Sequence, residues 1–142
     1  MDTIKGLSRT GAEPISIFLR ACVVLLALAT AAIHASLGGL LFTLNAVGYG
    51  ALAVAMVVPA LGPVRWLVRL ALLGFTGATI GGWVLFGARF PLAYLDKAVE
   101  LVLIGFLAIE LWLFDGGPLG VARRIRRLVH GIVVATVSRL GR

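Results

Sequence analysis

The sequence predicts an all-α protein: a four-helix transmembrane bundle with up-down-up-down topology, followed by a C-terminal basic amphipathic helix at the membrane interface. Of the 142 residues, 61% are apolar and 13% are charged, and the mean hydropathy is +1.07. A soluble domain is nearer half apolar and a quarter charged. The apolar residues also fall into four runs of roughly 20, the length that a helix needs to cross a bilayer.

The four expected spans are residues 17–36, 40–61, 66–88 and 94–114. Glycine and proline punctuate the chain between them, as expected at helix ends. Because each link is short, neighbouring helices should be antiparallel. The expected organisation is a cytoplasmic N-terminal segment (1–15), a four-helix transmembrane domain (16–115) and a cytoplasmic basic tail (116–142).

The distribution of basic residues predicts the orientation. Lysine and arginine accumulate in the cytoplasmic loops of membrane proteins. With the N-terminus inside, only Arg89 and Lys97 of the thirteen lysines and arginines fall on the outer side. Both termini are therefore expected in the cytoplasm.

Polar residues from three spans converge in the outer half of the expected bundle. This intramembrane polar cluster comprises His34, Asn45, Asp96, Lys97 and Glu100, and Thr43, Thr76 and Thr79 could extend it. Ionisable groups inside a membrane are costly, so they are functional-site candidates by default. The simpler interpretation is that Asp96, Lys97 and Glu100 form ion pairs at a helix start.

The fourth span carries acidic residues at two depths. One helical face contains Asp96, Glu100, Leu103, Leu107 and Glu110. The functional interpretation is a proton or cation path that uses Glu110 as its inner-side carboxylate. The simpler interpretation pairs Glu110 with Arg65 or Arg69, and the two leucines between the carboxylates favour it.

His34 has two interpretations of its own. An imidazole in a span can ligate haem or chlorophyll. Alternatively, it forms a hydrogen bond to Asn45 or Glu100. A bis-histidine haem is not expected, because the second histidine, His130, lies in the tail. No metal site is expected either, because Cys22 and His34 lie at opposite depths.

Small residues define two smooth helix faces. They are Ala27 and Ala31 in the first span, and Gly74, Gly77 and Gly81 in the third. Such faces let helix backbones approach closely. We expect tight packing there, either within the bundle or against another subunit.

The tail has an apolar and a basic face. Its basic residues are Arg123, Arg124, Arg126 and Arg127, opposite a stripe of valine, isoleucine and leucine. Anionic lipid of the inner leaflet attracts such a helix. We expect a membrane anchor, with docking of a protein partner as the alternative. Nucleic acid is not expected as a partner, because the basic residues are tied to the membrane surface.

Two stretches carry a family resemblance. They are Ala-Ala-Ile-His at 31–34, running into Leu-Phe-Thr-Leu-Asn-Ala-Val-Gly at 41–48, and Tyr-Leu-Asp-Lys-Ala-Val-Glu at 94–100. They resemble a loose group of short, mostly uncharacterised four-span bacterial integral membrane proteins. The resemblance covers the spans and not the tail. It implies a bacterial inner-membrane protein and no particular activity.

No phosphate-binding loop, Ser-His-Asp set or HExxH sequence is present, so an enzyme is not expected. The leading hypothesis is a non-catalytic accessory or assembly subunit of a larger membrane complex, plausibly respiratory or photosynthetic. The first alternative is a small oligomeric transporter or channel that uses the polar cluster and Glu110. The second is a haem- or pigment-binding protein.

Overall fold

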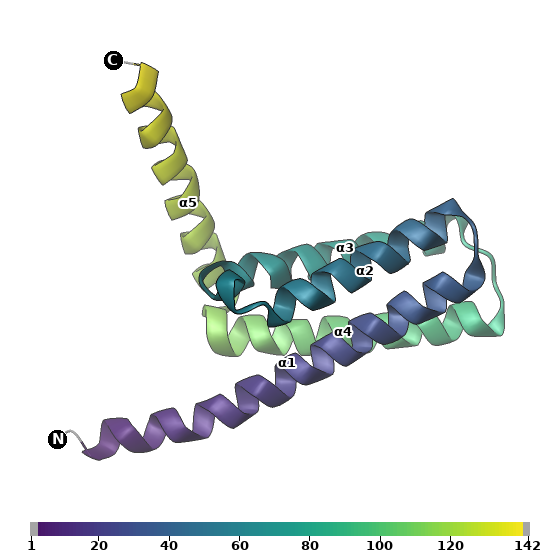
Figure 1. Cartoon of the computed structure of the whole chain (residues 1–142), viewed down its shortest axis with the longest axis horizontal. Helices are drawn as coiled ribbons and strands as arrows, with labels where there is room; N and C mark the ends of the chain where they lie inside the picture. The colour runs from purple at the N-terminus through teal and green to yellow at the C-terminus, as the bar shows by residue number, and fades with distance from the viewer. Residues whose placement is uncertain (1–2, 141–142) are drawn as a thin grey trace.

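The computed structural model describes residues 3–140, with side chains described at 13–134, 136 and 137. The described residues form helices and no strand, which confirms the all-α class. The helices are α1 (Thr3–Leu37), α2 (Leu40–Val57), the short 3-10 helix η1 (Pro59–Val64), α3 (Arg65–Phe86), α4 (Pro91–Asp115) and α5 (Gly117–Leu140). Figure 1 shows α1 to α4 gathered in one bundle and α5 leaving it at a steep angle.

The links fall where glycine and proline predict them. Gly38 and Gly39 join α1 to α2 with φ angles of 69° and 86°, which L side chains rarely adopt. Residues 87–90 join α3 to α4, and Pro91 starts α4, where a missing N–H costs nothing. We call the end of the bundle that carries these two links the link end, and the opposite end, with η1 and the start of α5, the tail end.

Helix α1 begins well before the expected first span. The N-terminal segment 1–15 was expected to precede the first span, yet α1 is one continuous helix from Thr3. Pro14 lies inside it without ending it. The sequence offers no other strong helix breaker there apart from two glycines, so a helix started in the span can extend towards the N-terminus.

Three segments are long and apolar enough to cross a membrane: Glu13–Leu37, Leu40–Val57 and Pro59–Phe86. Helix α4 has 25 residues, but any 18 consecutive residues of it include at least three charged ones. Those charges point inwards: Asp96, Glu100 and Glu110 are at most 2% exposed. The outward side of α4 is apolar, as its exposed side chains Leu95, Leu101, Val102, Ile109 and Leu113 demonstrate.

The middle of the bundle is an apolar layer. Its fully buried members are Val23, Ala27, Tyr49, Ala53, Met56, Leu72, Leu103 and Leu107, which come from all four helices. Leu103 and Leu107 lie on the same face of α4 as Asp96, Glu100 and Glu110, and all five are buried. The predicted stripe along α4 is therefore confirmed as its core-facing side.

The two faces of small residues, on α1 and on α3, pack differently. Ala27 is buried, and Ala31 packs against the apolar layer, so the alanine face of α1 packs within the bundle as expected. The glycine face of α3 does not pack within the bundle. A Cβ added to Gly74, Gly77 or Gly81 would meet no atom within 4 Å. Of the two alternatives for this face, packing within the bundle does not occur, because α3 turns Leu72 and Thr76, on its opposite side, towards the core. Packing against another subunit stays a prediction.

Helix α5 is amphipathic, as predicted. Only its first turns touch the bundle, where Val121 packs against Trp66 and Leu111. Beyond that point, Arg123, Arg126 and Arg127 are exposed and Arg124 is half-buried. The apolar stripe is also exposed, at Ile125, Leu128, Val129, Ile132 and Val133. The helix therefore leaves the bundle with an apolar face still to be covered.

Candidate functional site

A set of polar side chains is buried near the link end, and we call it the link-end network. It comprises His34 from the last turn of α1, Tyr49 from α2, Thr79 from α3, and Asp96, Lys97 and Glu100 from the first turns of α4. Every charged member is less than 9% exposed. All four helices of the bundle therefore meet at one buried polar site.

Lys97 bridges the two carboxylates of the network. Its Nζ lies 2.9 Å from Asp96 Oδ2 and 2.6 Å from Glu100 Oε2. The expected ion pairing at the start of α4 is confirmed. The pairing is not the usual solvated arrangement of a helix start, because all three groups are buried and their attraction is poorly screened.

Glu100 also has hydroxyl partners. Tyr49 donates a hydrogen bond to Glu100 Oε1 at 2.8 Å, and the Thr79 hydroxyl lies 2.8 Å from the same oxygen. Thr79 thus extends the cluster as expected, whereas the exposed Thr43 bonds its own helix at Gly39. Tyr49 was missed by the sequence analysis. The available signal was a tyrosine in the middle of an apolar run, because a buried phenol needs a partner.

His34 bonds a partner that was not expected. Its Nδ1 lies 3.0 Å from the carbonyl oxygen of Thr30, one turn earlier on α1. A carbonyl only accepts, so Nδ1 carries the hydrogen. The predicted bond to Asn45 or Glu100 is wrong, since the backbone carbonyl of its own helix is closer. Asn45 is half-buried and lines a cavity instead.

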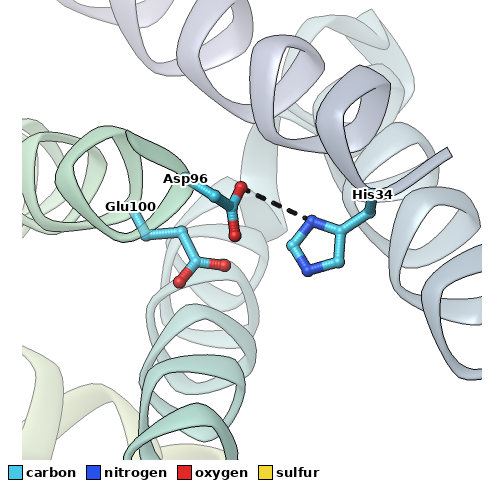
Figure 2. A group of neighbouring side chains, drawn as sticks. All are labelled: His34, Asp96 and Glu100. Carbon is cyan, nitrogen blue, oxygen red and sulfur yellow. Dashed lines mark ion pairs between the residues drawn. The ribbon is translucent and has the colours of Figure 1, made fainter. Parts of the chain in front are cut away.

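This arrangement leaves one carboxylate oxygen without a donor. Asp96 Oδ1 is buried and has no hydrogen-bond partner in the part of the chain that the structure describes. His34 Nδ1 is 3.6 Å away, too far for a hydrogen bond (Figure 2). One ligand atom each from His34, Asp96 and Glu100 lie within 4.8 Å of one another. The three side chains thus form a compact group of buried metal-ligating atoms.

A cavity of about 420 Å³ adjoins the network at the link end. His34, Asn45, Thr79, Asp96 and Lys97 form its polar part. Its remaining walls are mostly apolar, with the aromatic side chains Phe42, Phe75, Trp83, Phe86 and Phe90. An apolar cleft with a few convergent polar groups is the usual form of a small-ligand site.

The tail end holds a second set of charges, the tail-end network. Arg69 on α3 donates to Glu110 Oε2 at 2.5 Å and to Asp115 Oδ2 at 2.8 Å, and Arg124 on α5 bonds Asp115 Oδ1 at 2.9 Å. The positive charges of Arg69 and Arg124 thus balance the negative charges of Glu110 and Asp115. The expected pairing of Glu110 with Arg69 is confirmed, and this favours a structural role for Glu110.

Asp115 was also missed by the sequence analysis. A carboxylate in the last turn of a helix opposes the helix dipole, which is a signal that it has a specific partner. Gly116 and Gly117, both with positive φ, turn the chain so that Arg124 returns to it. Asp115 therefore ties α3, α4 and α5 together.

Comparisons with protein-family models, with curated proteins and with solved structures found no match. The class of protein is therefore inferred from the buried charges of the chain itself.

Replacing Arg69 by methionine should destabilise the protein by about 3–5 kcal/mol, because it leaves the buried carboxylates of Glu110 and Asp115 without their shared partner. Thermal unfolding in detergent micelles measures the effect. Arg89→Met is the control. Arg89 lies exposed on the link between α3 and α4, where it stacks on Trp83 and donates a hydrogen bond to the Val84 carbonyl. Loss of this exposed cation–π contact should change stability by about 1 kcal/mol. Equal losses in the two variants would contradict a structural tail-end network.

Proposed function

We propose that this chain is an integral membrane protein of four spans, with α4 as the fourth and both termini in the cytoplasm. Helix α4 is as long as the other candidate spans, and its charges face the bundle while its outward side is apolar. The link of four residues before it returns the chain beside α3 (Figure 1). The bias of lysine and arginine towards the tail end supports the orientation.

Within that frame, we propose that the protein binds a small cation in the link-end network and acts as a protomer of a transporter. The observation that carries this proposal is Asp96 Oδ1, a buried carboxylate oxygen with no donor among the described residues. With His34 neutral, two carboxylates face a single ammonium, and the network is one positive charge short. A buried charge of this kind is costly until a cation or proton compensates it.

The cavity and the apolar layer define the direction of access. The cavity reaches the network from the link end, which the proposed orientation places outside. Towards the tail end, Leu103, Leu107, Met56 and Leu72 close the bundle. A cation bound at Glu100 therefore needs a rearrangement of this layer to go further, which favours a carrier over an open channel. Glu110 Oε1 is also buried without a hydrogen-bond partner among the described residues. The charge of Glu110 is nevertheless paired with that of Arg69, so Glu110 has no part in the proposed binding.

A second role, as a non-catalytic accessory or assembly subunit of a larger membrane complex, is supported by the glycine face of α3. Gly74 and Gly77 are exposed and have open space around them. A helix of another chain could approach that backbone closely. The two roles are compatible, since small carriers commonly function as oligomers.

Haem or chlorophyll at His34 is less well supported. The centroid of the His34 imidazole lies 5.7 Å from that of the Tyr49 ring and 6.0 Å from that of the Phe42 ring. Its Nδ1 also lies 3.6 Å from Asp96 Oδ1. A haem or chlorophyll macrocycle would have to displace these side chains. It would also leave the Asp96 carboxylate without a partner.

The topology predicts which positions are accessible from outside. In a chain with Cys22 replaced by serine, Ser36→Cys and Ala88→Cys at the link end should react with a membrane-impermeant maleimide in intact cells. Ala60→Cys and Leu119→Cys at the tail end should react only after lysis. If Leu119→Cys reacts from outside while Ala60→Cys stays protected, α4 does not cross the membrane. If both react from outside and the link-end cysteines do not, the proposed orientation is inverted.

Cation transport should depend on Glu100. In liposomes loaded with a pH-sensitive dye, an imposed acid gradient should drive proton entry, and Glu100→Gln should slow it at least tenfold by removing a charge of the network. Glu13→Gln is the matched control, because Glu13 is an exposed carboxylate on α1. Unchanged entry in folded Glu100→Gln, with protons and with other cations in the gradient, would overturn the transport proposal.

Association through α3 should depend on Gly77. Gly77→Leu fills the open face and should reduce oligomerisation or the recovery of co-purifying chains, measured by light scattering of the detergent-solubilised protein. Gly105→Leu, at an exposed glycine of α4 that also has open space, is the control. A wild-type protein that purifies as a stable lone monomer would count against the subunit role.

A further inference from the structure

We infer that the link-end network is a binding site for a divalent transition-metal ion, with His34, Asp96 and Glu100 as ligands and the Lys97 ammonium as the cation that the metal displaces. This inference rests on the proposed function, since it names the cation that the network takes up. Four observations carry it: the spacing of the ligand atoms, the hydrogen on His34, the orphaned oxygen of Asp96 and the position of Lys97.

The spacing is close to that of a coordination sphere. The three ligand atoms lie within 4.8 Å of one another. Metal–ligand bonds of about 2.1 Å in tetrahedral geometry separate neighbouring ligands by about 3.4 Å. The ligand atoms therefore need to close by at most about 1.4 Å, a shift that rotations of the Asp96 and Glu100 side chains can supply.

The tautomer of His34 suits metal binding. Because Nδ1–H is donated to the Thr30 carbonyl, the neutral ring keeps its lone pair on Nε2. Metal-ligating histidines typically donate their other nitrogen to a backbone carbonyl or carboxylate, which fixes the tautomer and the ring orientation. The contact within α1 therefore prepares Nε2 as a ligand.

Asp96 supplies the strongest indication of a missing charge. Its side chain is 2% exposed, and Oδ1 has no partner among the described residues. The oxygen lies 3.6 Å from His34 Nδ1, the nitrogen bonded to Thr30, and on the same side of α4 as the imidazole ring that carries Nε2 (Figure 2). A metal ion bound to both groups would satisfy this oxygen, which neither the imidazole nor Lys97 does.

Lys97 occupies the position of a cation and has room to leave it. Its ammonium bridges Asp96 and Glu100, and its side chain also lines the cavity. With Lys97 in place, the two carboxylates and one ammonium sum to −1. With a divalent ion in place and the ammonium withdrawn towards the cavity mouth, they sum to zero. Lys97 therefore acts as a tethered competitor that weakens metal binding and makes it reversible.

The donor set indicates the class of metal. One imidazole and two carboxylates suit Zn²⁺, Mn²⁺, Fe²⁺ or Co²⁺, whereas Mg²⁺ and Ca²⁺ prefer oxygen ligands alone. The cavity leaves a side of the group open for a water or a further ligand. Three protein ligands with an open position are typical of sites where the metal exchanges or reacts.

The test is calorimetric titration of Zn²⁺ and Mn²⁺ into chelator-treated full-length protein in detergent. We expect one ion per chain, at least tenfold weaker binding in His34→Gln, Asp96→Asn and Glu100→Gln, and unchanged binding in His130→Gln. His130 is the matched control because it is the second histidine of the chain and lies on α5. The absence of saturable binding, or equal losses in His34→Gln and His130→Gln, would overturn the inference.

Variants of Lys97 test whether its ammonium competes with the metal ion. Lys97→Met removes the competing ammonium and should bind metal at least tenfold more tightly, whereas Lys97→Arg, which keeps the charge, should not. Weaker binding in a folded Lys97→Met would overturn the tethered-competitor role. If Lys97→Met fails to fold, the wild-type protein still decides, because Zn²⁺ should raise its unfolding temperature and that rise should be lost in Asp96→Asn.

The two proposals fail separately. Proton entry that depends on Glu100 without any metal binding would overturn the metal site and leave the transport function standing. Metal binding with the expected dependence on His34 and Lys97, without transport of any cation, would support the metal site and overturn the transport function.

Discussion

The charges of α4 impose the constraint on which the rest of the structure depends. In the proposed four-span arrangement, nothing in the bilayer core can solvate a carboxylate, so each one needs a partner inside the protein. Helix α4 therefore turns its charged stripe inwards, and each of the other bundle helices contributes a group to it: His34 from α1, Tyr49 from α2, and Thr79 and Arg69 from α3. The same rotation leaves the opposite side of α4 apolar and exposed.

The bundle consequently has three layers of different character. The tail-end network is balanced, with the guanidinium of Arg69 between two carboxylates, and it joins α5 to the bundle through Asp115. The middle layer is apolar and fully buried. The link-end network is not balanced, and it adjoins the cavity of about 420 Å³ at the link end. The paired charges thus lie at one end of the molecule, and the cavity with its polar group lies at the other.

The imbalance at the link end has a simple chemical meaning. A buried carboxylate oxygen without a donor is normally avoided in folded proteins, so its presence beside an imidazole and a cavity indicates a place for an exchangeable positive charge. Lys97 satisfies part of this demand through its ion pairs with Asp96 and Glu100. In the proposed carrier, displacement of the Lys97 ammonium would let the site bind a cation reversibly.

The sequence alone determined the helical class, the links at Gly38-Gly39 and before Pro91, and the buried stripe of α4 from Asp96 to Glu110. These features are local, because hydropathy, turn residues and helical periodicity act within one segment. Only the tertiary structure decided that His34 bonds Thr30, that Tyr49 bonds Glu100, and that the glycine face of α3 points outwards. Periodicity gives the polar side of each helix, but the rotation of one helix against its neighbours depends on packing among all four.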